Sequence, residues 1–62
     1  MDTFSAVMIA EGAEPAEEHE IIQAWQYLID TGLAFQLQGA FGRTAMALID
    51  EGICKSANEL SA

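Results

Sequence analysis

The chain has 62 residues, of which 52% are hydrophobic, and ten acidic residues against two basic ones give a formal net charge of −8. A charge of this sign repels phosphate backbones and anionic lipid headgroups over about 8 Å, the Debye length in physiological salt, so we expect no direct nucleic-acid or membrane binding. Chains this short bury only about 60% of their unfolded surface, and the single cysteine, Cys54, provides no internal disulfide. We therefore predict one small domain over residues 1–62, completed by homo-oligomerisation with a dimer favoured.

The N-terminal segment is apolar enough for either a helix or a strand. Thr3 is placed to cap a helix that carries Phe4 and Val7 on one side, and Gly12 is placed to end it. We favour a helix over about residues 4–11.

The second element begins with Pro15 followed by carboxylates, which is typical of a helix start. At 100° per residue its apolar side chains fall on one continuous arc: Ala24, Leu28, Ile21, Trp25, Ile29 and Ile22. Thr31 and Gly32 supply a C-terminal stop. The pattern predicts an amphipathic helix over about residues 15–31 with Trp25 at the centre of its buried face.

A third helix is predicted over about residues 33–51, continuous or gently kinked. Its apolar arc consists of Leu37, Leu48, Phe41, Ala34, Ala45, Ile49, Gly42, Phe35 and Met46. Gln38 falls within this arc, so a continuous helix buries its amide, whereas a break at Gly39 or Gly42 turns the amide toward water. Gly52 ends the helix, and we expect a mobile tail from about residue 55.

These elements predict an all-α fold, a small bundle of two main helices with a short N-terminal helix. No apolar run reaches the roughly 18 residues of a membrane span, and Met1 is followed by Asp2 rather than by a basic leader. The lone Cys54 is expected to be a small buried hydrophobe. Together these features favour a cytoplasmic protein.

No motif in the chain carries recognisable chemistry. His19 lies on the solvated arc of the second helix, and one histidine with one distant cysteine does not make a zinc site. The acidic cluster at the start of that helix does not close an oxygen shell around a cation. We expect no enzymatic activity, no metal site and no cofactor.

The polar, glycine-containing segment from Asp30 to Ala45 is the part that amphipathic packing does not explain. Arg43 shares a narrow polar stripe with Asp50, and it either pairs with an acidic side chain (Asp50, Asp30 or Glu51) of the same chain or of another subunit, or contacts a partner. Small residues here allow another backbone to approach closely. The candidate interface residues are Tyr27, Phe35, Gln36, Gln38, Gly39, Gly42, Arg43 and Thr44.

The run from Ala24-Trp25-Gln26 through Thr31-Gly32-Leu33-Ala34-Phe35-Gln36-Leu37-Gln38-Gly39-Ala40-Phe41-Gly42-Arg43-Thr44-Ala45 to Leu48-Ile49 resembles a family of very short, uncharacterised bacteriophage proteins. The resemblance covers about half of the chain, together with the opening segments Thr3-Phe4 and Met8-Ile9-Ala10-Glu11-Gly12. It implies an accessory phage product that is expressed in the cytoplasm of a bacterial host.

Three functions follow as hypotheses. The first is an interaction protein that binds and modulates a bacterial host protein, with the acidic charge directing it to basic partners. The second is a structural or assembly role in which self-association is the function. The third is binding of a small molecule, such as a nucleotide, at an oligomer interface around Gln36, Gln38, Arg43 and Thr44.

Overall fold

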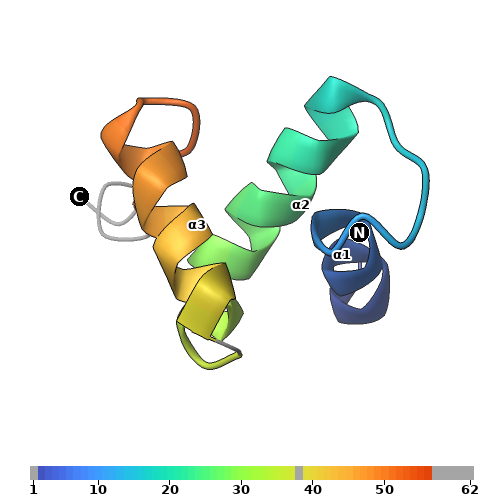
Figure 1. Ribbon diagram of the computed structural model, residues 1–62, viewed down its shortest axis with the longest axis horizontal. Coiled ribbons are helices and arrows are strands. Elements are labelled where there is room, and N and C mark those ends of the chain that lie inside the picture. The colour runs from blue at the N-terminus through green and yellow to red at the C-terminus, as the bar shows by residue number, and fades with distance from the viewer. Residues whose placement is uncertain (1, 38, 57–62) are drawn as a thin grey trace.

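Three α-helices and one turn of 3-10 helix form the part of the chain that the structure, a computed structural model, describes: residues 2–37 and 39–56. The elements in chain order are α1 (Thr3–Ala10), α2 (Glu18–Asp30), η1 (Leu33–Phe35) and α3 (Gly39–Asp50). Helix α2 lies between α1 and α3 (Figure 1). These residues contain no strand, which confirms the all-α prediction and decides the N-terminal segment in favour of a helix.

Helix α1 packs along α2 near the N-terminus of the chain (Figure 1). Ala6 is fully buried at this contact, and its small side chain lets the two helices approach closely. The hydroxyl groups of Thr3 and Tyr27 are hydrogen-bonded at 3.1 Å, which fixes the start of α1 against α2. Phe4 points away from the contact and is 65% exposed.

Helix α2 begins at Glu18, three residues after Pro15, where the sequence predicted its start. The N-cap residue is Glu17, whose backbone is extended (φ −78°, ψ 163°). The Glu17 backbone N–H donates to the Glu20 carboxylate at 3.1 Å, which satisfies a donor that the helix itself leaves free. This capping interaction places the start of the helix at Glu18. The helix ends at Asp30, and Gly32 adopts the predicted left-handed conformation, with φ 80°.

The single helix predicted over residues 33–51 is wrong. The segment is divided into η1 and α3, and α3 starts at Gly39, which is one of the two breaks weighed above. Gly32 and Gly39 bracket the break, and glycine is a poor former of helix interior. Phe35 and Leu37, which the predicted helix placed on its apolar arc, are 49% and 40% exposed. Gln38 lies outside the described residues.

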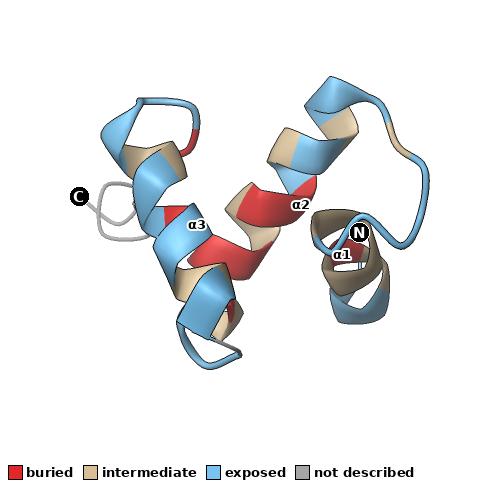
Figure 2. Ribbon diagram, in the orientation of Figure 1, coloured by how far each residue is buried: buried red, intermediate tan, exposed pale blue. Residues whose placement is uncertain are grey.

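The core runs along α2 and reaches η1, α3 and the segment after α3 (Figure 2). Its buried residues are Ala6, Ala24, Trp25, Leu28, Ile29, Ala34, Ala45 and Cys54. The Trp25 and Phe41 rings, with centroids 5.3 Å apart and planes tilted by 43°, join α2 to α3. The predicted buried face of α2 is confirmed at Ala24, Trp25, Leu28 and Ile29.

The segment after α3 returns to α2. Gly52 takes a positive φ of 78°, and Ile53 N–H donates to the Leu48 carbonyl at 3.0 Å, which closes the end of α3. Cys54 is buried as expected, 2% exposed. We predicted a mobile tail from about residue 55, but two hydrogen bonds join Lys55 to Gln26. Residues 57–62 lie outside the described part of the chain.

Candidate protein interaction surface

One side of α3, together with η1, forms a shallow hollow of about 620 Å³. We call this surface the α3 face, and it is lined by Phe35, Gly39, Gly42, Arg43, Met46, Ala47 and Asp50. Four of these residues, Phe35, Gly39, Gly42 and Arg43, belong to the interface predicted from the sequence. Met46, Ala47 and Asp50 were not in that set.

The α3 face follows from sequence spacing. Gly39, Arg43, Met46 and Asp50 are separated by four, three and four residues, so they form one stripe along the helix. Ala47 lies beside Met46 on the same side. A stripe with this spacing is the pattern through which two helices pack lengthwise. Met46 lies on the apolar arc predicted from the sequence and is 49% exposed.

The apolar part of the α3 face is formed by Phe35 and Met46, each half exposed. Gly42 also lines the hollow. A Cβ atom on Gly42 would lie 3.8 Å from the Ala34 carbonyl oxygen and 3.8 Å from Phe35 Cδ1. The backbone that approaches Gly42 is therefore that of η1 in the same chain, and this approach holds Phe35 at the edge of the face.

The charged part of the α3 face consists of Arg43 and Asp50, both exposed. Arg43 makes no ion pair within residues 2–37 and 39–56, so the predicted pairing with Asp50, Asp30 or Glu51 is not formed there. Two turns of helix separate Arg43 from Asp50, about 10.5 Å along the axis. Each side chain therefore presents its charge to an approaching molecule.

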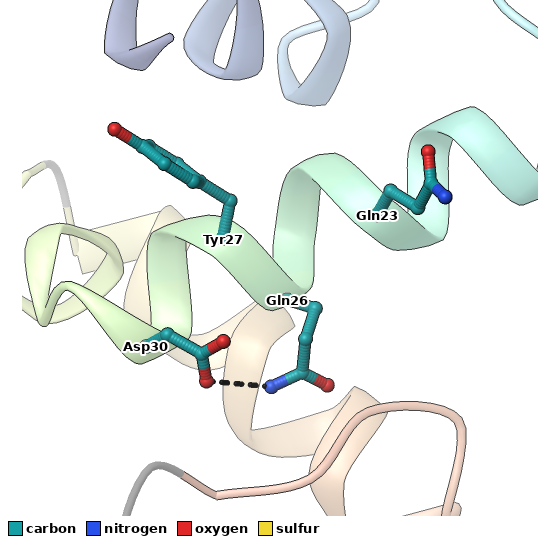
Figure 3. Close-up of a pocket in the computed structure, with 4 residues that line it drawn as sticks. All are labelled: Gln23, Gln26, Tyr27 and Asp30. Carbon is teal, nitrogen blue, oxygen red and sulfur yellow. Dashed lines mark hydrogen bonds between the residues drawn. The ribbon is translucent and has the colours of Figure 1, made fainter. Parts of the chain in front are cut away.

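Three of the other predicted interface residues, Tyr27, Gln36 and Thr44, do not line the α3 hollow. Tyr27 projects from α2 beside a second hollow of about 380 Å³ that Gln23, Gln26 and Asp30 also line (Figure 3), and its hydroxyl contacts α1. Gln36 and Thr44 are exposed but do not line the α3 hollow. Gln38 is outside the described residues. The predicted set is thus divided, with its apolar and cationic members on one surface.

Gln26 has a structural role that sequence reasoning missed. Its side-chain amide donates to the Lys55 carbonyl at 2.8 Å and to Asp30 Oδ1 at 2.9 Å, and its oxygen accepts from the Lys55 N–H at 2.8 Å. The periodicity of α2 places Gln26 on the polar side, which the structure bears out, but no local signal indicates a partner 29 residues away.

A family model matches residues 2–62, almost the whole chain. The chain belongs to the family described as a domain of unknown function, DUF7417. No curated protein and no solved structure matched it. Membership in the DUF7417 family agrees with the expected membership in an uncharacterised family.

Chemically reactive groups in this DUF7417 member are dispersed. Among the described residues, no three His, Cys, Asp or Glu side chains are grouped so as to hold a metal ion. His19 is exposed, 3.5 Å from the Glu17 carboxylate. Burial raises the pKa of the Cys54 thiol, and the nearby charge of Asp30 raises that pKa further.

In the part of the chain that the structure describes, no helix is long and apolar enough to cross a membrane. The α3 face is the candidate interaction surface among the described residues.

Proposed function

We propose that this chain is a small acidic phage accessory protein that acts by protein–protein interaction and modulates a bacterial host protein in the cytoplasm. The observation that supports this most is the α3 face, where half-exposed Phe35 and Met46 lie beside an exposed arginine. The phage and host context comes from the sequence resemblance.

The composition of the α3 face suits a protein partner. Aromatic residues, methionine and arginine are enriched in protein interfaces, because they bury large contact areas or form forked hydrogen bonds. Phe35, Met46 and Arg43 represent all three classes on one small surface. Burying apolar area contributes about 25 cal/mol per Å², so covering Phe35 and Met46 favours association.

The charge distribution favours partners with a basic surface. Residues 2–37 contain no lysine or arginine. Four glutamates are exposed in the connection between α1 and α2 and at the first residue of α2: Glu11, Glu14, Glu17 and Glu18. Such an uncompensated acidic region accelerates encounter with a basic protein more than it adds to final affinity. The acidic region and the α3 face therefore have different expected roles, one in steering and one in contact.

The second candidate is a structural role through self-association. It is favoured because Arg43 and Asp50 lie on one stripe of α3, where each could meet the opposite charge of a second copy. Nucleotide binding has less support. Of the set proposed for it, Gln38 lies outside the described residues, and among Gln36, Arg43 and Thr44 only Arg43 lines the hollow. A single cation per chain gives weak recognition of a phosphate group.

Affinity capture with two matched variants tests the proposal. Met46→Lys places a charge on the α3 face, and Phe4→Lys makes a comparable change at an exposed apolar residue of α1. Tagged wild-type chain and both variants are incubated with lysate of a bacterial host, and captured proteins are identified by mass spectrometry and then titrated in purified form. We expect wild type and Phe4→Lys to bind the same purified protein, and Met46→Lys to bind it at least about tenfold more weakly. Equal binding by all three, or no saturable binding, would argue against the α3 face as the contact surface.

A further inference from the structure

We propose that the partner seated on the α3 face is a second copy of this chain, in an antiparallel two-fold arrangement that places Arg43 of each copy against Asp50 of the other. The inference goes beyond the proposed function: it assigns a second occupant to the same surface, so self-association and binding of a host protein would compete for the α3 face.

The first argument is the position of the two charges. Arg43 and Asp50 lie on one stripe, and the midpoint between them falls between Met46 and Ala47. In a two-fold interface, if residue i contacts residue j, then residue j also contacts residue i. A two-fold axis at that midpoint, perpendicular to α3, brings Arg43 opposite Asp50 twice. The same axis brings Met46 opposite Ala47 twice.

The second argument is the match of side-chain sizes. Met46 is half exposed and flexible, and Ala47 is small and exposed, so a methionine from one helix fits over the alanine of the other. At Gly39, farther along the stripe, a Cβ atom would meet no other atom within 4 Å. This end of the face is therefore open, and Phe35 flanks it.

The third argument is that the charges select the orientation. Parallel pairing of the same face would bring Arg43 against Arg43 and Asp50 against Asp50, and like charges oppose association. Two copies that each carry a net charge of −8 also repel overall, so a self-interface needs local attraction. Arg43 is the only cation of α3, and the acidic connection between α1 and α2 lies on the far side of α2 (Figure 1). Antiparallel pairing through α3 uses this cation and keeps the acidic connections apart.

Charge reversal tests the inference with four proteins: wild type, Arg43→Asp, Asp50→Arg and the double variant that carries both changes. Both positions are exposed, so folding is expected to persist and is checked by circular dichroism. Sedimentation equilibrium over a concentration series gives the dimer Kd of each. We expect each single change to raise Kd by about tenfold or more, and the double variant to regain a Kd within about threefold of wild type, because it restores both pairs with their signs exchanged. Added salt should reduce the differences.

Three results would overturn the inference. A wild-type chain that sediments at 6.7 kDa at every concentration has no self-interface. A dimer insensitive to all three changes uses another surface or a parallel arrangement, and a double variant no better than the singles lacks the cross pair. The proposed function is judged separately: a monomeric chain whose binding to a purified host protein is lost in Met46→Lys and kept in Phe4→Lys retains that function while refuting the antiparallel dimer.

Discussion

The side-chain amide of Gln26 pairs with both polar backbone groups of Lys55, accepting from its N–H and donating to its carbonyl, each at 2.8 Å. A primary amide has the same donor and acceptor arrangement as a peptide group, so Gln26 takes the place of a neighbouring backbone. The pairing holds the segment after α3 against α2, where Cys54 completes the core.

Replacing Gln26 with alanine should therefore loosen this segment. We expect Gln26→Ala to lower the free energy of unfolding by about 1–2 kcal/mol, because its two hydrogen bonds to Lys55 and its one to Asp30 are lost and the segment that contains Cys54 is no longer fixed to α2. Urea unfolding at one fixed protein concentration measures the change. Gln23→Ala, one turn earlier on the same helix and exposed, is the matched control and should remain within about 0.5 kcal/mol of wild type. Equal losses in both variants would contradict the role assigned to Gln26.

The contact between Trp25 and Phe41 should dominate the packing of α3 on α2. We expect Phe41→Ala to cost about 2–3 kcal/mol, somewhat below the range for a fully buried phenylalanine, since Phe41 is only partly buried. Phe4→Ala removes the same side chain from a 65% exposed position and should cost little. Near-ultraviolet circular dichroism would report the loss of the fixed Trp25 environment only in the first variant. If both variants unfold at the same urea concentration, the ring contact contributes little.

Gly42 and Gly52 should respond oppositely to the same substitution. Gly42 lies in a helix, and a Cβ there would make only ordinary 3.8 Å contacts, so Gly42→Ala is expected to raise the unfolding free energy by about 0.5–1 kcal/mol. Gly52 has a φ of 78°, which an alanine adopts only with strain, so Gly52→Ala should lower the unfolding free energy by about 1–2 kcal/mol. Thermal unfolding of dilute samples compares the two. A destabilised Gly42→Ala would show that η1 packs more tightly on α3 than these distances indicate.

The Cys54 thiol is expected to lower the free energy of unfolding at alkaline pH. Burial raises its pKa in the folded state, so the folded chain keeps a proton that the unfolded chain releases above about pH 8.5. The thiol therefore has no effect on stability below that pH, and it lowers the free energy of unfolding as the pH rises toward the folded-state pKa. Cys54→Ala should show a smaller decrease over the same interval, although its stability is lower throughout because of the cavity. Parallel pH profiles for the two proteins would refute this assignment.

The sequence predicted the parts of the fold that depend on periodicity and on chain-reversing glycines. The buried face of α2 around Trp25 and Leu28 follows from spacing alone, as does the helix stop at Gly32. The start of α2 was misplaced, because the proline signal competed with a capping interaction between Glu17 and Glu20 that is equally local. Periodicity also extended the third helix too far back, since it records which side is apolar and not whether the backbone is continuous.

The candidate surface was only partly predictable for a different reason. Phe35, Gly39, Gly42 and Arg43 were identified by their unusual composition, but Met46 has the periodicity of a core residue. Whether such a residue is buried depends on which other segments of the chain pack against it. A helical wheel contains no information about these contacts. The pairing of Gln26 with Lys55 is likewise a contact between distant segments without a local signature.

The central claim is that the α3 face is the surface through which this chain contacts other protein. A dilution series followed by two-dimensional amide NMR tests it most directly, because each backbone N–H reports its own surroundings. We predict concentration-dependent shifts grouped on η1 and the Gly39, Arg43, Met46 and Asp50 stripe, with α1 and the acidic connection unchanged. Shifts grouped on α1 and the acidic connection instead, or a spectrum independent of concentration together with unchanged α3 signals when a captured host protein is added, would contradict the account.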